Sequence, residues 1–449
     1  MENQNLLVGL DIGTSTIKAV VSDNGKVIGA AMSHNEGMSH GQIVDIDETA
    51  AAIKKAINEL SEKAGSRINR VVTSIPVTML QLETASGVLS VSDTGREVTN
   101  DDVKHVLNSA IKSAEHQGRS AISYLPSRFV IDGRTDVKDP RKMIAHSLAV
   151  TGILLTAPDS LLHNLNKAME KAQVYNSFFV PAPLAVSSVA LSEGERTFGS
   201  ILLDLGGGTT SATVIHQGKI KYANVVLNGG IDVTKDISVV LATSQKEAES
   251  LKHDYGFADP ELASSESKFV VPTVGASDQQ TVDEKYLSEI INARIEQILT
   301  KIAKGLAKHD MLDLPGGIII TGGASAIQGI GELVSQGLGV KTRVYKPDQL
   351  GMRNSAYSVA YGIVNYVSKM TDIEFLATDV IYQTKLIQPE EDVQKPTIQE
   401  QSRPVGEKLS EEAYNKNSKL NILASKDKNK QDKKENKKNF KDFIKKFFD

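Results

Sequence analysis

The sequence contains no cysteine and no tryptophan among its 449 residues. The absence of cysteine excludes disulfide bridges, thiolate metal sites and thiol catalysis, and it fits a reducing compartment. No stretch approaches the roughly 18 consecutive apolar residues that a membrane-spanning helix needs. The first residues, MENQNLLVGLDIG, have neither a basic region nor a long apolar region, so no secretory signal is expected. We therefore expect a cytoplasmic chain that meets a membrane only from the side.

An excess of positive charge is also absent. The formal net charge is -4 at pH 7, which argues against a nucleic-acid-binding protein. Apolar runs of strand length alternate with segments of helical period from about Met1 to Lys369, and this alternation predicts a mixed α/β body. Residues 373–436 are mostly Gln, Glu, Lys, Asn, Ser and Pro. Such a composition buries too little apolar surface to fold, so it predicts a disordered linker.

An internal repeat is the most informative feature of the body. "GLDIGTSTIKAVVSDNGKVIG", from Gly9, aligns without a gap with "LLDLGGGTTSATVIHQGKIKY", from Leu202, so that Asp11 meets Asp204 at a separation of 193 residues. Each copy is typical of a strand, a turn rich in glycine and hydroxyl residues, a strand, a second turn and a strand. Because one separation holds through two successive turns, we interpret the copies as duplicated structural halves.

The first turn of each copy suits a phosphate group. Glycines allow close backbone approach, amide N–H groups form an anion nest, and hydroxyls add donors. β-Branched residues follow each turn, and no Ser or Thr follows Lys26 or Lys219, so Rossmann and P-loop sites are disfavoured. Two facing turns would clamp a polyphosphate, with Asp11 and Asp204 holding Mg²⁺ through water. The alternative is a pair of plain hairpins with capping aspartates. The candidate residues are Asp11, Gly13, Thr14, Ser15, Thr16, Lys18, Asp204, Gly206, Gly207, Gly208, Thr209 and Thr210.

Two of these expectations carry explicit alternatives. Lys18 lies on a strand that leaves the first turn, where it either reaches a phosphate or faces solvent. A third stretch, "GGIIITGGASAIQGI" from Gly316, predicts a buried strand at 318–321 that runs into Gly322 and Gly323 and then a helix. The glycine pair leaves room for a flat base or ribose, or else forms only a tight strand-to-helix turn.

Together the three stretches resemble the phosphate-1, phosphate-2 and adenosine motifs of the actin, Hsp70 and sugar-kinase superfamily. "PAPLAVSSVAL", from Pro181, and "AYSVAYGIVNYV", from Ala356, resemble its inter-lobe helices, in which small residues permit close crossing. "GGIDVTKDISVVLATSQKEAESLKHDYG", from Gly229, is similar to the FtsA family of bacterial cell-division proteins. The resemblance covers about residues 6–370 and implies a two-lobed actin-like ATPase fold with duplicated RNase H-like subdomains.

The same resemblance implies ATP and Mg²⁺ as cofactors. It implies further that an adenosine-side group of residues, named at the end of this paragraph, lies near the adenine and ribose. A solvated pair on a helix surface is the alternative for its two charged members. Related proteins often carry an acidic or amide side chain where this chain has Ala182 and an Asp where it has Ser211, so fast hydrolysis is not expected and no catalytic residue is assigned. The adenosine-side residues are Gly230, Glu249, Lys252, Gly322, Gly323 and Ala324.

The resemblance also divides the chain. The expected parts are a first-lobe core (1–83), an inserted α/β subdomain (84–161), a first-lobe segment with a connecting helix (162–197), a second lobe (198–355) with an insert at about 230–310, and a helix returning to the first lobe (356–372). Within the inserted subdomain, Thr99 is the expected N-cap of a helix. This subdomain implies self-association into filaments and contact with other division proteins, with a decorative insertion as the alternative. The family binds the FtsZ C-terminal tail on the second-lobe insert.

The segment 437–449 turns apolar again after the linker. On a helix, five apolar side chains at i, i+3, i+4, i+7 and i+8 form one stripe with lysines beside it. This pattern is typical of a helix that lies in the surface of an anionic membrane. The alternatives are a last helix packed on the protein's own core and a helix bound by a partner protein. The expected membrane-binding residues are Phe440, Phe443, Ile444, Phe447 and Phe448, with Lys441 and Lys445.

The leading hypothesis is an ATP-binding, actin-like cell-division protein. It is expected to polymerise on the cytoplasmic face of the membrane at the division site, to anchor FtsZ filaments there through its amphipathic helix, and to help recruit later proteins to the septal ring. A sugar-kinase-like or Hsp70-like phosphotransfer enzyme is the alternative, although no catalytic Asp can be assigned and a polar segment follows the body where a chaperone has a β-rich domain. An actin-like pilus-assembly or shape protein is a third reading.

Overall fold

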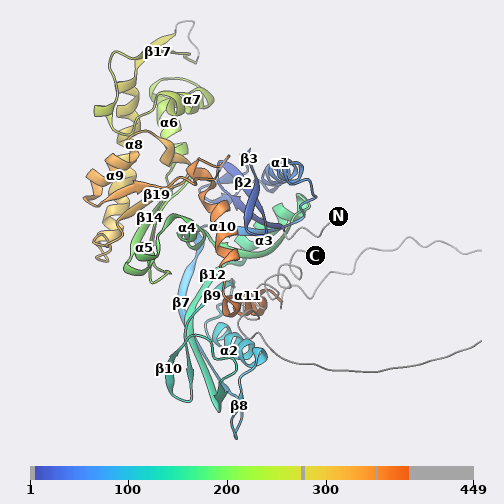
Figure 1. The fold of residues 1–449 in the computed structure, drawn as a ribbon. Coiled ribbons are helices and arrows are strands. Elements are labelled where there is room, and N and C mark those ends of the chain that lie inside the picture. Colours follow the sequence, from blue (N-terminus) through green and yellow to red (C-terminus); the bar gives the residue numbers. More distant parts are fainter. Residues whose placement is uncertain (1–5, 275–278, 350, 384–449) are drawn as a thin grey trace, which may run out of the picture.

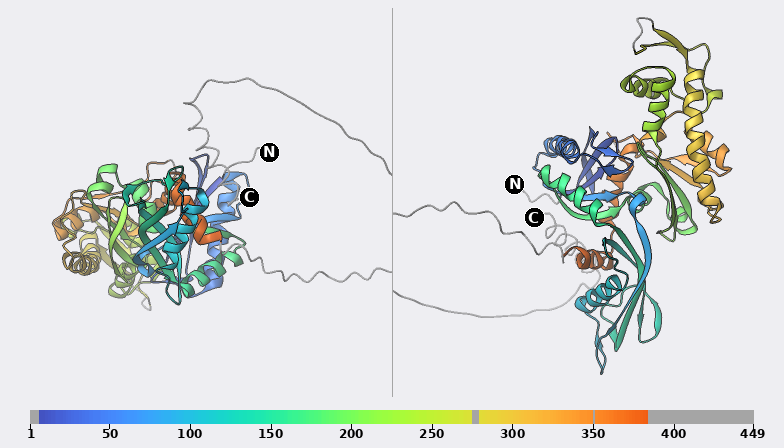
Figure 2. Two further views of the ribbon diagram at one scale, coloured as in Figure 1. Left: turned by 90° about the horizontal axis from the view of Figure 1, so that it is seen from below. Right: turned by 180° about the vertical axis from the view of Figure 1, so that it is seen from behind.

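The computed structural model describes residues 6–274, 279–349 and 351–383. This part of the chain forms two lobes, each built around a five-stranded sheet, and an inserted subdomain that projects from the first lobe (Figure 1). The view from behind shows the same three parts, with the inserted subdomain at one end and the helices of the second lobe at the other (Figure 2). The mixed α/β architecture predicted from the sequence is therefore confirmed.

The first lobe contains a sheet of strand order β13-β6-β1-β2-β3. The three strands of the first repeat are antiparallel neighbours, and β6 and β13 join them in parallel. Helix α1 (Ile46–Ala64) packs on β2 and β3, and helix α10 (Ser358–Ser368) packs on β1, β2 and β6. Because helices cover both faces, the strands are nearly continuous apolar runs. The strand bounds are β1 Leu6–Ile12, β2 Thr16–Asp23, β3 Lys26–His34, β6 Arg70–Ile75 and β13 Tyr175–Pro181.

The second lobe repeats this topology. Its sheet has the order β16-β15-β14-β19-β20, with the same two antiparallel and two parallel pairings. Asp11 pairs with Lys18 in the first sheet, and Asp204 pairs with Ser211 in the second, so the register also repeats. The duplication predicted from the aligned hairpins is confirmed. The strand bounds are β14 Ser200–Leu205, β15 Thr210–His216, β16 Lys219–Val226, β19 Ile318–Thr321 and β20 Thr342–Val344.

Two helices cross between the lobes: α4 (Ala182–Ala190) and α10 (Ser358–Ser368). A Cβ atom on Gly362 would lie 2.4 Å from the carbonyl oxygen of Ala185, so no side chain fits there. The hydroxyl of Ser188 donates to the carbonyl of Gly362 at 3.1 Å. The close crossing expected from the small residues is confirmed.

The inserted subdomain (Gln81–Pro158) is a sheet of order β10-β9-β12-β7 with helix α2 on β7 and β12. Thr99 caps α2 as predicted, and the Asp102 carboxylate accepts from the Thr99 amide at 2.8 Å, which completes a capping box. Strands β8 and β11 form a separate two-stranded sheet. The bounds are β7 Gln81–Ser90, β8 Arg96–Glu97, α2 Asn100–Lys112, β9 Arg119–Ile131, β10 Arg134–Val137, β11 Ile144–Ala145 and β12 Ser147–Pro158.

The remaining elements complete the lobes. The second-lobe insert consists of α6, α7, β17, β18 and α8, in which α6 packs against both α7 and α8. The other elements are the small hairpin β4–β5 and helices α3, α5 and α9. Their bounds are β4 Met38–Ser39, β5 Gln42–Ile43, α3 Asp159–Lys171, α5 Glu193–Phe198, α6 Gly230–Val240, α7 Gln245–Tyr255, β17 Lys268–Val271, β18 Gln280–Asp283, α8 Glu284–Ala307 and α9 Ile330–Leu338.

The linker predicted for residues 373–436 is wrong at its start. Residues Asp372–Gln383 form helix α11, which packs on β9 and α2 of the inserted subdomain and on β13 of the first lobe. Ile373, Ala377 and Ile381 recur every fourth residue and are buried. The composition averaged over the polar stretch concealed this one apolar face. The linker beyond residue 383 and the predicted membrane-binding segment 437–449 lie outside the described residues.

No helix in the described ranges is both long enough and apolar enough to span a membrane.

Candidate functional site

The turns of the two repeats face each other across a cleft of about 130 Å³ between the lobes. Twelve of the predicted residues line this cleft, and they come from both repeats and from the glycine pair after β19. The structure therefore brings together segments separated by about 190 and 310 residues of sequence. The predicted lining residues are Asp11, Gly13, Thr14, Ser15, Thr16, Lys18, Asp204, Gly206, Gly207, Thr209, Gly322 and Gly323.

Asp11 is held between two first-lobe side chains. The ammonium of Lys18, on the paired position of β2, lies 3.3 Å from Asp11 Oδ2, and the hydroxyl of Ser74 in β6 donates to Oδ1 at 2.8 Å. Lys18 is buried, so of its two possible orientations the structure has the one facing the cleft. The neighbouring strands thus fix the carboxylate at the opening of the first turn.

Asp204 occupies the equivalent position in the second lobe without an equivalent lysine, because Ser211 stands opposite it. Removal from bulk water and the negative charge of Asp11 raise the pKa of Asp204 to about 6, although Lys18 opposes this. The two carboxylates therefore repel each other across the cleft. A cation or a proton between them would relieve that repulsion.

The two turns touch directly. A Cβ atom on Gly207 would lie 2.5 Å from the hydroxyl of Ser15, and one on Gly208 would lie 2.8 Å from the side chain of Thr14. His40, in the turn of the β4–β5 hairpin, donates from Nδ1 to the Gly208 carbonyl at 3.1 Å. The Gly41 amide donates to the Thr14 hydroxyl at 3.1 Å. Glycine is required at both positions because the backbone of the second-lobe turn lies directly against side chains of the first-lobe turn.

The glycine pair after β19 forms the other end of the cleft. Gly322 has φ of 91°, a left-handed conformation that favours glycine, and a Cβ there would also meet the Leu205 carbonyl. A Cβ on Gly323 would meet no atom within 4 Å. The surface above Gly323 is consequently open to a ligand.

Lys252, which is buried, and Glu249, which is exposed, form a hydrogen-bonded network beside the cavity, not in its lining. The Lys252 ammonium donates to the Gly230 carbonyl at 3.0 Å, to the Thr234 hydroxyl at 2.7 Å and to Glu249 Oε2 at 2.7 Å. Burial pushes the pKa of Glu249 up, but the charge and hydrogen bond of Lys252 and the hydroxyl of Thr234 bring it below its ordinary value. The alternative of a fully solvated surface pair does not hold for Lys252, which is 8% exposed.

The remaining predicted residues lie just outside the lining. Thr210 is buried in β15 and its hydroxyl donates to the Asn228 carbonyl at 2.9 Å. Ala324 begins the turn after Gly323 and would meet a Cβ placed on Gly230. The Gly230 amide donates to the Gly206 carbonyl at 2.9 Å, so helix α6 starts directly on the second phosphate-type turn.

The cleft also contains residues that the sequence did not reveal. The hydroxyls of Thr78, Thr213 and Thr321 are buried and have no hydrogen-bond partner, and all three residues line the cleft. Thr213 lies in β15 and Thr321 lies in β19, the two strands that flank β14, so the sheet brings them together. In the sequence, Thr213 and Thr321 are distinguished only as hydroxyl residues within apolar strands. Buried hydroxyls are normally paired, so three unpaired hydroxyls on residues around one cleft are unusual.

Within the described ranges no group of three or more His, Asp and Glu residues is arranged to hold a metal ion. Asp11 and Asp204 are thus the two carboxylates in the lining, and both belong to the predicted set.

Two sheets of the same strand order, joined by crossed helices around a cleft, define the actin-like ATPase fold. Solved structures of that fold superpose on most of the chain. A PilM-PilN type IV pilus biogenesis complex matches with a TM-score of 0.56 and 17% identity, over 80% of this chain and 97% of the other. MreB5 of Spiroplasma citri bound to ADP matches with a TM-score of 0.50 and 13% identity, over 81% of this chain and 96% of the other.

Sequence comparison identifies the family within that fold. The model of "Cell division protein FtsA" matches residues 201–362, and that of "SHS2 domain inserted in FTSA" matches residues 78–156. Cell division protein FtsA of Enterococcus hirae is 39% identical over 84% of this chain and 86% of its own length. FtsA of Bacillus subtilis (strain 168) is 33% identical over 95% of this chain and 99% of its own length. The chain belongs to the FtsA family of cell-division proteins.

Proposed function

We propose that this actin-like cell-division protein binds ATP in the cleft between the lobes. The observation that carries the proposal is the convergence of both repeat turns and the Gly322–Gly323 pair on one cavity that also holds three unpartnered hydroxyls. The turns would hold the phosphates, because backbone amides, Ser15 and Thr14 face that part of the cleft. The open surface above Gly323 would receive the adenosine. The ADP in the similar MreB5 structure supports this class of ligand.

Mg²⁺ fits the two carboxylates of the cleft. Mg²⁺ usually keeps several waters and takes one or two carboxylates together with phosphate oxygens, so Asp11 and Asp204 suffice as its protein partners. The pKa of Asp204 is raised because the carboxyl is buried near the negative charge of Asp11, and a cation at this position would stabilise its ionised form. Lys18 would compensate the phosphates on the first-lobe side, since it already lies in the lining.

Slow hydrolysis is part of the proposal. Ala182 and Ser211 both line the cleft, at the positions where related proteins often carry acidic or amide groups. Phosphoryl transfer to water requires a side chain that orients the attacking water. A methyl group cannot do so, and Ser211 is short and buried in β15. We expect ATP to act mainly by holding the lobes together.

A substitution at Gly323 tests the site. Gly323→Val points into open space, so the fold should persist while the side chain blocks the adenosine position. We expect the affinity for a fluorescent ATP analogue to fall at least about tenfold, with an unchanged unfolding midpoint. Gly194→Val is the matched control, because a Cβ at Gly194 also meets no atom within 4 Å and lies in α5, outside the cleft lining. Retained affinity in Gly323→Val would refute the assignment.

We further propose that the protein polymerises on the cytoplasmic face of the membrane and anchors FtsZ there. Membership of the FtsA family supports the division role, and the apolar stripe of the segment 437–449 supports the attachment to anionic lipid. The inserted subdomain would serve self-association and contact with other division proteins. The second-lobe insert would receive the FtsZ C-terminal tail, and exposed Val239 and Val270 offer apolar surface there.

Co-sedimentation with anionic liposomes tests the membrane part. The full chain should pellet with vesicles and carry purified FtsZ with it, whereas a chain ending at Lys438 should stay in the supernatant and still bind ATP. A second variant, Phe443→Glu with Phe447→Glu, keeps the length and lysines and places charge on the apolar stripe. Equal pelleting of all three proteins would contradict the proposal.

A further inference from the structure

Helix α11 contacts both the inserted subdomain and the first lobe, although it follows both of them in the sequence. It packs on β9 and α2 of the inserted subdomain and on β13, the edge strand of the first-lobe sheet. Its buried residues Ile373, Ala377 and Ile381 belong to the same apolar core that contains residues of both units. A helix in this position covers the seam between them.

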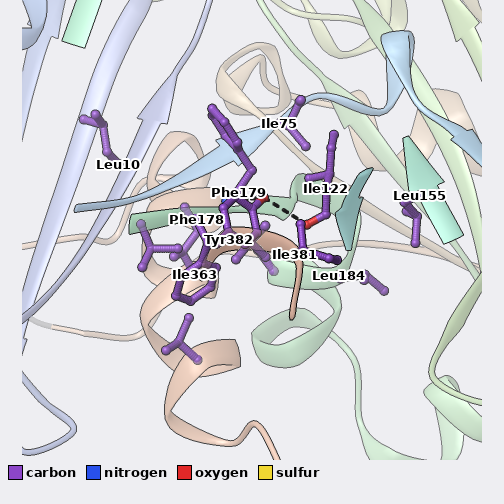
Figure 3. Close-up of a cluster of buried hydrophobic side chains, with 14 of the residues drawn as sticks. Leu10, Ile75, Ile122, Leu155, Phe178, Phe179, Leu184, Ile363, Ile381 and Tyr382 are labelled. Carbon is purple, nitrogen blue, oxygen red and sulfur yellow. Dashed lines mark hydrogen bonds between the residues drawn. The ribbon is translucent and has the colours of Figure 1, made fainter. Parts of the chain in front are cut away.

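Tyr382, near the end of α11, ties the two sheets together through one hydroxyl. Its oxygen accepts from the Phe179 amide of β13 at 3.1 Å. It also donates to the Ile122 carbonyl of β9 at 2.9 Å (Figure 3). The Tyr382 ring lies 6.1 Å from the ring of Phe178, centroid to centroid, and the residue is 8% exposed. The same hydroxyl therefore serves the first lobe and the inserted subdomain at once.

The two backbone groups are available for different reasons. β13 is the edge strand of its sheet, so part of its backbone groups point away from β6, and the β9–β12 register shifts beside Ile122, which has no paired residue in β12. A bulge leaves backbone groups without ladder partners, and buried backbone groups need one. Tyr382 satisfies one group on each sheet.

Ion pairs fasten the rest of the helix to the inserted subdomain. Lys104 of α2 lies 2.6 Å from the largely buried carboxylate of Asp379, and Arg141 lies 3.1 Å from Asp372 at the first turn. Beside the Arg141–Asp372 pair, a cleft of about 1,050 Å³ is bordered by β9, the segment after β10, Asn24 of the first lobe, and the chain from the end of α10 to the start of α11. The junction between the inserted subdomain and the first lobe is thus held at separate contacts with a cleft beside them, so the subdomain has room to move.

We propose that α11 is a clasp that fixes the orientation of the inserted subdomain on the first lobe, with Tyr382 as its closing residue. While the clasp is closed, the subdomain moves as part of the first lobe. When it opens, the subdomain tilts about the two strands, β7 and β12, that connect it to the lobe. The clasp is a property of the fold and holds whatever the inserted subdomain binds.

Distance measurement on the full chain tests the proposal. Because the sequence has no cysteine, Lys26→Cys in the first lobe and Glu97→Cys in β8 give a single pair of nitroxide labels, and both side chains are exposed. The parent should show one narrow distance distribution. Tyr382→Phe keeps the ring and removes both hydrogen bonds, so the distribution should broaden and the Phe179 amide should exchange with solvent roughly tenfold faster.

Tyr124→Phe is the matched control. Its hydroxyl donates to the Ala85 carbonyl at 3.1 Å, entirely within the inserted subdomain, and the residue is also buried. This variant should leave the distance distribution and Phe179 exchange unchanged. Lys104→Met, on a partly exposed side chain, provides a second opening of the clasp should Tyr382→Phe fail to fold. An unchanged distribution in the folded clasp variants would overturn the proposal.

Discussion

The ammonium of Lys219, at the start of β16, donates a 2.7 Å hydrogen bond to the hydroxyl of Ser127 in β9. The second lobe thus touches the inserted subdomain, which α11 fastens to the first lobe. We expect a large rotation of one lobe against the other to break this bond or to move the inserted subdomain with it.

Lys219→Ala should loosen the inserted subdomain at this contact. We expect amide exchange around Ser127 to rise a few-fold, roughly the effect of one net hydrogen bond. Lys221→Ala, on an exposed neighbour two residues along the same strand, should leave that exchange unchanged. Hydrogen–deuterium exchange of the full chain measures both. Equal behaviour of the two variants would show that the Ser127 bond restrains nothing.

Asp204 should make the ligand-free protein less stable as the pH rises. The folded state raises the pKa of its carboxyl from 3.8 to about 6, so the folded protein holds a proton that the unfolded chain releases. Stability from this group is present below about pH 4 and is lost as the pH rises through about 6. Asp204→Asn should therefore raise the urea midpoint at pH 7.5 and change it little at pH 4.5.

The control for this experiment is Glu289→Gln, an equally isosteric change of an exposed carboxylate on α8. It should leave the midpoint unchanged at both pH values. A gain of the same size for Asp204→Asn at pH 4.5 and pH 7.5 would mean that the buried charge is not its source. In the presence of MgATP the parent should have the higher urea midpoint and Asp204→Asn the lower one, because only the parent offers two carboxylates to Mg²⁺.

Lys252→Met should weaken the start of α6 and, with it, nucleotide binding. The substitution removes the donor to the Gly230 carbonyl, Thr234 and Glu249, at an expected cost of about 1–3 kcal/mol in the free energy of unfolding. Lys246→Met, exposed on the same helix, is the control. Because Lys252 helps to lower the pKa of Glu249, the difference between parent and variant should shrink as the pH falls through that pKa, below 4.5. A difference that is constant with pH would exclude this pair as its cause.

Gly362→Ala should destabilise the protein by about 1–3 kcal/mol, because the added methyl would overlap the Ala185 carbonyl of α4. Gly331→Ala in α9 is the opposite case. Its Cβ would have its nearest neighbour at 3.6 Å, so the usual helix preference should stabilise it by about 0.5–1 kcal/mol. Urea unfolding of the two variants gives the comparison. If both substitutions changed the free energy of unfolding in the same direction, the helix crossing would have room to adjust.

The features predictable from the sequence are those whose residues lie close together along it. The repeat containing Asp11 and Asp204 predicted the three antiparallel strands of each sheet, because a duplicated hairpin pattern indicates the order and the register of neighbouring strands. Thr99 as an N-cap and Gly322 after β19 were likewise local signals. Each depends on a few neighbouring residues whose physical roles are narrow.

The features that were missed depend on distant contacts. His40 meets Gly208 from 168 positions away, and Thr213 and Thr321 join the cleft only because their strands flank β14. Helix α11 was missed for another reason: Ile373 and Ile381 lie at the edge of a long polar stretch whose average hides them. Tyr382 gains its role from the outer edge of β13 and an irregularity in β9, which no local pattern predicts.

The contact between α4 and α10 restricts how these two helices can move against each other. At Gly362 and Ala185 the helices meet backbone to backbone, without an interdigitating side chain. Both helices belong to the same apolar core as the first-lobe strands, and sliding of one along the other would drive larger side chains into carbonyl oxygens. We therefore expect the crossing to move as one piece with the first lobe.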